Sequence, residues 1–158
     1  MIIDGIAVFP LPGCREPLSS VSHMLGAAVF TAMAILLIRR GRGDWVRTTS
    51  LGVMAASSVL LLLLSSAYHL TWPGPTREFL LRADVAGIFL LIAGSMTPIH
   101  AILFTGPSRW LALIFIWTIA VVGILLRMIY HEFVTDAVGV SIFLLCGWGS
   151  LITAIVLW

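Results

Sequence analysis

Charged residues are scarce in this chain, and that scarcity excludes an ordinary soluble globular protein. Asp, Glu, Lys and Arg together make up 10% of the 158 residues, whereas 60% of the residues are hydrophobic. A soluble protein of this size would have to leave much of that apolar surface in contact with water. The composition therefore indicates an integral membrane protein.

The sequence also lacks the alternation of polar and apolar residues that is typical of a membrane-spanning β-barrel. Barrel strands are segments of ~10 residues with alternating polarity. Residues 60–64 and 88–92 are instead continuous apolar runs. No basic segment precedes the first apolar run and no small-residue cleavage site follows it, so we expect no removable secretory signal. Membrane-spanning helices remain as the expected structure.

The chain has only two cysteines and a small net positive charge, so neither a disulfide framework nor a nucleic-acid partner is expected. Cys14 and Cys146 show no metal-ligand spacing, and Cys146 lies within an apolar run, so we predict no disulfide between them. The net charge is +2, but the arginines lie beside the apolar runs. Anionic lipid headgroups are the natural partner there. We therefore expect membrane lipid as the partner, and no nucleic acid.

Five long apolar runs dominate what is present. Each approaches or exceeds the ~20 residues that a helix with a rise of ~1.5 Å per residue needs to cross a hydrocarbon core of ~30 Å. Proline, glycine and arginine interrupt them, which predicts loops at 39–47 and 72–82, and we expect an irregular tail up to residue 19. The predicted fold is all-α, a polytopic membrane helix bundle in one domain (1–158). Its spans are expected at 22–38, 51–70, 85–104, 110–128 and 137–158.

Short connections make neighbouring helices antiparallel, and this order brings distant residues to one side of the membrane. We call the side where the first span begins the near side, and the opposite side the far side. Four arginines on the near side and five on the far side do not decide the orientation. His100 is expected on the far side. The near side should gather Glu16, His23, His69, Asp84, His131 and Glu132.

Within the near-side group, Ser65 and His69 stand four residues apart and share a helix face. Asp84 begins the next span, so its carboxylate can approach His69 across the hairpin. A carboxylate beside an imidazole fixes its tautomer, as it does for metal-binding histidines, and zinc favours imidazole nitrogen. Simpler structural roles stay open: His69 could stabilise a helix end, Asp84 could cap one, and Ser65 could bond the preceding turn.

Three motifs occur in order along the chain. Glu16, His23 and Gly26 stand in the pattern Glu-x6-His-x2-Gly, Ser65 and His69 in the pattern Ser-x3-His, and residues 82–98 read RADVAGIFLLIAGSMTP. Together they resemble the opening, second-span and third-span motifs of the hemolysin III family, the bacterial branch of the progestin and adipoQ receptors. The resemblance covers nearly the whole chain.

The resemblance implies a seven-helix protein of the bacterial inner membrane with a zinc site near its N-terminal side, in a group that includes alkaline ceramidases. Carried over by motif, His69 binds zinc, while Ser65 and Asp84 support the metal and its water as catalytic residues. The chain departs from the family pattern at Ser19, where Asn is common, and at Val85, where His or Tyr is common. The implied substrate is a ceramide-like or other lipid.

The family's two further zinc ligands come from a His-x3-His in its seventh span, and that pattern does not occur here. No two of the four histidines are four residues apart. Three explanations stay open: the chain is a fragment, it is a natural short form without the site, or ligands such as His131 or those of another chain complete it. We therefore expect this form to bind zinc weakly or not at all. Two function classes remain, a zinc-dependent lipid amide or ester hydrolase and a non-catalytic membrane sensor or pore former.

Overall fold

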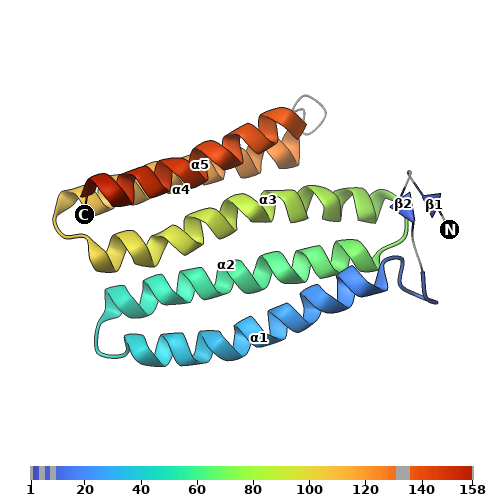
Figure 1. Cartoon of the computed structure of the whole chain (residues 1–158), viewed down its shortest axis with the longest axis horizontal. Helices are drawn as coiled ribbons and strands as arrows, with labels where there is room; N and C mark the ends of the chain where they lie inside the picture. The colour runs from blue at the N-terminus through green and yellow to red at the C-terminus, as the bar shows by residue number, and fades with distance from the viewer. Residues whose placement is uncertain (1, 4–5, 8–9, 131–135, 158) are drawn as a thin grey trace.

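The protein is an all-α bundle of long apolar helices. The computed structural model describes residues 2–3, 6–7, 10–130 and 136–157. Five helices follow one another in the described residues, each antiparallel to the helix before it, and one π-helical segment continues α3 (Figure 1). Their bounds are α1 (Pro17–Gly41), α2 (Trp45–Leu70), α3 (Pro75–Pro98), η1 (Ile99–Leu103), α4 (Pro107–Ile129) and α5 (Asp136–Leu157).

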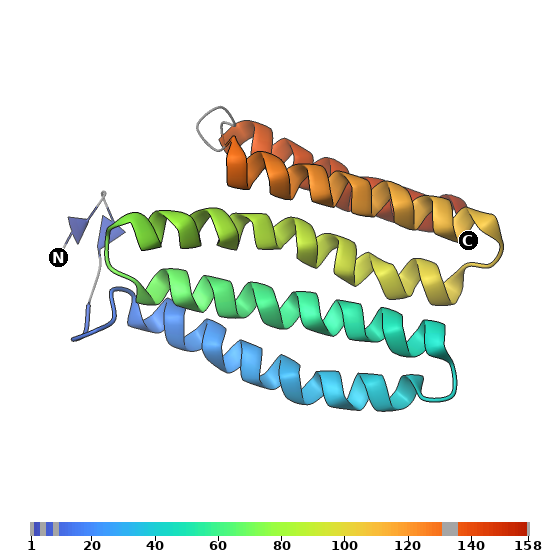
Figure 2. The same cartoon turned by 180° about the vertical axis from the view of Figure 1, so that it is seen from behind.

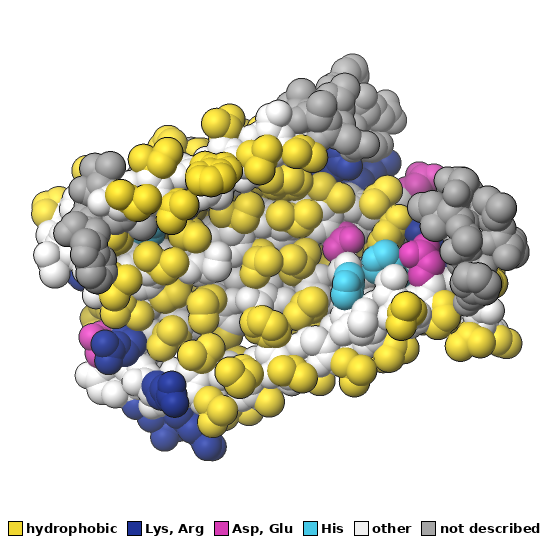
Figure 3. Space-filling model, in the orientation of Figure 1, with side chains coloured by type: hydrophobic (Ala, Val, Ile, Leu, Met, Phe, Trp, Pro, Cys, Tyr) yellow, Lys and Arg dark blue, Asp and Glu magenta, His cyan; other side chains and the backbone are white. Residues whose placement is uncertain are grey.

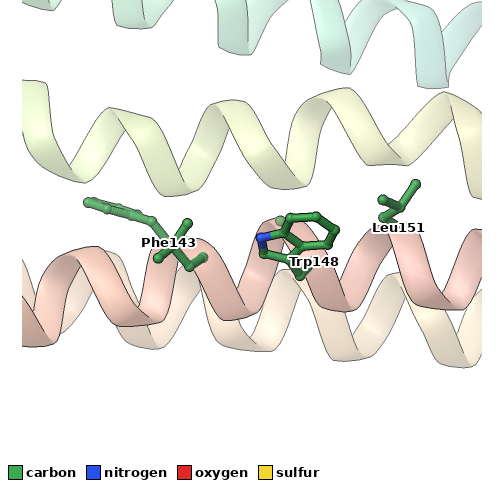
Figure 4. Close-up of a pocket in the computed structure, with 5 residues that line it drawn as sticks. Phe143, Trp148 and Leu151 are labelled. Carbon is green, nitrogen blue, oxygen red and sulfur yellow. The ribbon is translucent and has the colours of Figure 1, made fainter.

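Four of these segments are long and apolar enough to cross a membrane: α1, α2, the continuous stretch from α3 through η1, and α4. The fifth helix, α5, is 22 residues long, and the described part of its apolar stretch is Gly139–Gly149. Large apolar side chains cover much of the outer surface (Figure 3), with Leu25 and Leu111 more than 60% exposed. The predicted polytopic membrane bundle is confirmed.

The helices are longer than the predicted spans, so both predicted loops are too long. The α1–α2 turn is confined to residues 42–44, because the Asp44 side chain accepts hydrogen bonds from the backbone N–H groups of Val46 and Arg47 and starts α2 early. Similarly, Pro75 occupies the first turn of α3 and starts that helix inside the predicted loop. Apolar runs mark only the part of a helix that crosses hydrocarbon, and polar turns extend it on either side.

The N-terminal tail is less irregular than predicted. Two short strands, β1 (Ile2–Ile3) and β2 (Ile6–Ala7), pair antiparallel, and Leu11 and Cys14 form an isolated bridge. The polar turn predicted before the fifth span falls mainly on residues 131–135, which lie outside the described residues.

The helices form a curved row in which each packs on its neighbours in sequence, and α5 lies against both α4 and α3 (Figures 1 and 2). The buried core between α3 and α4 is built from Phe89, Ala93, Ile116 and Ala120. The α2–α3 contact is close at Gly94, where an added Cβ would lie 2.0 Å from Ser57 Oγ. Small residues allow this approach, as is common between membrane helices.

Candidate functional site

Polar side chains gather on the near side, where α1 begins, α2 ends and α3 begins. Figure 3 shows histidine and acidic side chains grouped at this end of the bundle, whereas arginines crowd the far-side turn between α1 and α2. The alternation inferred from the sequence is confirmed, because the α1–α2 and α3–α4 turns lie at one end and the α2–α3 turn lies at the other (Figure 1).

A pair of serines sets the register of α1 against α2. Ser20 Oγ donates to the Ser66 carbonyl oxygen at 3.1 Å, and Ser66 Oγ donates to the Ser20 carbonyl oxygen at 2.9 Å. Both serines are buried. Glu16 lies one turn before Ser20 and His23 about one turn after it, so all three share the face of α1 that packs on α2. This register brings Glu16 and His23 beside the last turn of α2.

The partner of Glu16 is His69. Glu16 Oε2 lies 2.6 Å from His69 Nδ1, while Glu16 Oε1 accepts a hydrogen bond from Arg77 Nη2 at 3.0 Å. Arg15 Nε adds a longer ion-pair contact of 3.6 Å to the same oxygen. The two partners are largely shielded from solvent, with 20% of the His69 side chain and 23% of the Glu16 side chain exposed. We call Glu16, His69 and Arg77 the carboxylate clamp.

The surroundings of Glu16 keep its carboxyl group ionised. Partial burial by itself raises its pKa, but the hydrogen bond with His69 and the charges of His69, Arg77 and Arg15 outweigh burial. The net result is a pKa below the ordinary value for Glu. An ionised carboxylate only accepts hydrogen bonds, so His69 Nδ1 carries the proton in the 2.6 Å contact.

The clamp also closes the C-terminal end of α2. The backbone N–H groups of Arg15 and Glu16 donate to the carbonyl oxygens of Leu70 and His69 at 3.3 and 3.1 Å. Arg77 Nη1 donates to two further carbonyl oxygens of this segment, those of Tyr68 and Thr71, at 2.8 and 2.9 Å. Carbonyl groups at a helix end have no partner within the helix, so these contacts satisfy them.

Ser65, His69 and Asp84 converge as the sequence predicts. The Asp84 side chain hydrogen-bonds with Ser65 and interacts electrostatically with His69 and His23. These four side chains come from three helices. The carboxylate bonded to His69 Nδ1, however, is Glu16 rather than Asp84, which leaves Asp84 to Ser65.

His23 faces the same cluster, and its described ring contact there is with His69. Its ring lies edge-on to His69, with the ring centroids 5.4 Å apart. Its Nδ1 atom is buried and has no hydrogen-bond partner among the described residues. The two carboxylate oxygens of Glu16 are directed at His69 and Arg77.

The donors present fit one part of a zinc site. His69 offers Nε2 once Nδ1 is engaged by a carboxylate, which is the usual arrangement of a metal-binding histidine. Asp84 adds a carboxylate beside it. Within the described residues, no group of three or more His, Cys, Asp or Glu side chains is arranged to hold a metal ion. His131 and the Cys146 side chain lie outside the described residues, and His100 is buried at the far side.

Sequence reasoning missed the partner of Glu16 and the role of Arg77. A signal for the first exists: Glu16, Ser20, His23 and Ala27 are spaced by four, three and four residues, which places them on one helix face. That face had to pack on α2, whose last turns include the polar residues Ser66 and His69. Arg77 gave no such signal, because the predicted loop at 72–82 hid its place at the start of α3.

Comparison with known proteins agrees with these observations. The family model described as Haemolysin-III related matches residues 14–158. The chain is 30% identical over 118 residues to Hemolysin-3 of Bacillus cereus, covering 73% of this chain and 54% of that protein. It is 24% identical over 141 residues to the Hemolysin-3 homolog of Bacillus subtilis (strain 168), covering 87% of this chain and 65% of that one. The chain therefore spans less than two thirds of either relative. No solved structure matches it.

Proposed function

Since the chain belongs to the haemolysin-III related family, we propose that it supplies the His69 side of a zinc site in a membrane-embedded hydrolase. The substrate class is a lipid amide or ester, such as a ceramide-like lipid, and the location is the bacterial inner membrane. The observation that carries this proposal is the convergence of Ser65, His69 and Asp84 from two helices at one membrane side.

Each residue has a distinct part in the proposed reaction. His69 would hold the metal through Nε2. When bound, zinc lowers the pKa of its water to ~7 and polarises a carbonyl group. Asp84 orients the attacking water by accepting its hydrogen bond, and the Ser65 hydroxyl keeps the Asp84 carboxylate in place. A group at the near-side helix ends would face the headgroup end of a bilayer lipid, where amide and ester bonds lie, and this supports a lipid substrate.

One observation favours a second function. Two relatives carry the name Hemolysin-3, so lysis of membranes is the alternative activity. A pore former would need no water-activating carboxylate. Vesicle leakage that is unchanged by Asp84→Asn, without any lipid hydrolysis, would support this second function over the first.

The hydrolase is tested with the gene expressed through to its stop codon. We expect release of fatty acid from a fluorescent ceramide-like amide or an ester analogue, with a loss of ~100-fold or more in Asp84→Asn, because the variant lacks the carboxylate that orients the attacking water. Asp44→Asn is the matched control, because Asp44 is a helix cap on the far side and should leave the rate unchanged. Hydrolysis at the wild-type rate in Asp84→Asn would overturn the proposal.

A further inference from the structure

The contact between Glu16 and His69 joins two helices and has no place in the chemistry described so far. We propose that Glu16 is a positioning residue, whose carboxylate fixes the His69 imidazole as the Nδ1–H tautomer and leaves Nε2 as the nitrogen that a metal ion can use. The identity of the metal rests on the proposed function. The tautomer itself depends only on contacts within this chain.

The geometry of the contact supports a donor at Nδ1. The distance of 2.6 Å from Glu16 Oε2 to His69 Nδ1 is short for a hydrogen bond, as is common when the acceptor is ionised. A carboxylate has no proton to give, so the imidazole must donate. A neutral imidazole that donates from Nδ1 carries its lone pair on Nε2. Carboxylate, histidine and metal arranged in this order are common in metalloproteins.

Glu16 is well placed for this task because it is itself fixed from several directions. Its backbone N–H donates to the His69 carbonyl oxygen at 3.1 Å, so its backbone and its side chain both bind the same residue. Its second carboxylate oxygen accepts from Arg77. The Arg77 guanidinium in turn bonds two carbonyl oxygens at the end of α2 and stacks on the Tyr68 ring at 4.0 Å. The carboxylate therefore has little freedom to leave His69.

A purely structural ion pair would look similar, so the roles of the two carboxylates near His69 need to be separated. Asp84 is engaged with Ser65, and its interaction with His69 is electrostatic. Removing Glu16 should therefore free Nδ1 without another hydrogen-bonded carboxylate taking its place. A structural role predicts altered stability with an unchanged tautomer, whereas a positioning role predicts an altered tautomer in protein that still folds.

The test is 15N NMR of the histidine ring nitrogens in the 158-residue chain, in lipid nanodiscs at a pH where the imidazoles are neutral. The His69 signals are assigned by their loss in His69→Gln. We expect a protonated Nδ1 and an unprotonated Nε2 in the wild type, and a shift towards the Nε2–H tautomer in Glu16→Ala. Glu16→Gln keeps an acceptor oxygen and should retain more of the Nδ1–H form. Glu78→Gln, which removes an exposed carboxylate next to Arg77, is the matched control and should change nothing.

A protonated Nε2 in the wild type would overturn the proposal without any variant, even if Glu16→Ala failed to fold. An unchanged His69 tautomer in folded Glu16→Ala would overturn it as well.

Zinc analysis of the product expressed through the stop codon separates this inference from the proposed function. There Glu16→Ala should weaken zinc binding by ~10–100-fold, the usual loss when an outer partner of a metal ligand is removed. If the His69 tautomer depends on Glu16 but the protein binds no zinc, the proposed hydrolase is refuted and the positioning role of Glu16 stands. If the protein binds zinc but the His69 tautomer is the same with and without Glu16, the positioning role is refuted and the proposed hydrolase stands.

Discussion

His69 and His100 both lie at the end of a membrane helix, but their surroundings differ completely. His69 ends α2 on the near side, where Glu16 and His23 reach it from α1 and Asp84 lies beside it from α3. His100 lies at the end of the third span on the far side, and two contacts of its ring are with its own segment. Its Nδ1 atom lies 3.1 Å from the Met96 carbonyl oxygen one turn earlier, and its ring lies against Phe104.

The two histidines differ in how many helices contribute to their described surroundings. A group of ionisable side chains drawn from three helices is costly to assemble within a bilayer and usually serves a function. His100 is fully buried, and its Nδ1 lies within hydrogen-bond distance of a carbonyl oxygen of its own segment. His100 lies in the π-helical segment η1 and is buried there together with Ala101.

The largest expected effect is that the near side and the far side lie on opposite faces of the membrane. In a chain without Cys14 and Cys146, Arg42→Cys and Thr76→Cys should react with a membrane-impermeant thiol reagent from opposite faces of sealed vesicles. Both positions are exposed, one in the α1–α2 turn and one in the first turn of α3. Thr105→Cys, in the α3–α4 connection, is the control and should react from the same face as Arg42→Cys. Labelling of Arg42→Cys and Thr76→Cys from one face would break the distinction between near side and far side.

The second prediction sharpens the contrast between the histidines through stability. His100→Ala removes a side chain with 0% exposure and should lower the free energy of unfolding in detergent by about 2–4 kcal/mol, because a cavity remains. His69→Ala should cost only about 1 kcal/mol, since Arg77 still pairs with Glu16. A larger loss of stability in His69→Ala than in His100→Ala would indicate that His69, rather than His100, mainly contributes to packing.

The general architecture follows from the sequence because its causes are local. Uninterrupted apolar runs predict membrane helices, and short connections predict alternation, so Ser65, His69 and Asp84 could be placed on one side without a structure. Helix ends were predicted less well. Asp44 and Pro75 start their helices earlier than hydropathy suggests, through a cap and through proline geometry.

The partner of His69 could not be predicted in the same way, because it depends on the rotation of α1 about its axis. The serine pair of Ser20 and Ser66 sets that rotation through two hydrogen bonds between residues 46 positions apart. Spacing alone made Glu16 equally able to reach His23. Only packing decides between the two histidines.

A smaller effect is expected from pH. The pKa of Glu16 lies below its ordinary value of 4.5, so the ionised carboxylate stabilises the folded state at neutral pH. That stabilisation is present above about pH 4.5 and is lost as the pH falls through the lower pKa of the folded state. Thermal unfolding of Glu16→Gln should therefore depend less on pH below 4.5 than that of the wild type. If the unfolding temperatures of the wild type and Glu16→Gln depend on pH in the same way, the ionised Glu16 carboxylate contributes no net stabilisation.

Zinc content tests the central claim, that the near side rather than the far side carries the functional site. The 158-residue chain has one histidine matched to the family site, so we expect no stoichiometric zinc after dialysis, because zinc normally needs three or four protein ligands. If the reading frame of the gene continues into a His-x3-His, its product should retain zinc, keep it in His100→Ala and lose it in His69→Ala. Zinc retained by His69→Ala, or lost in folded His100→Ala, would contradict the account.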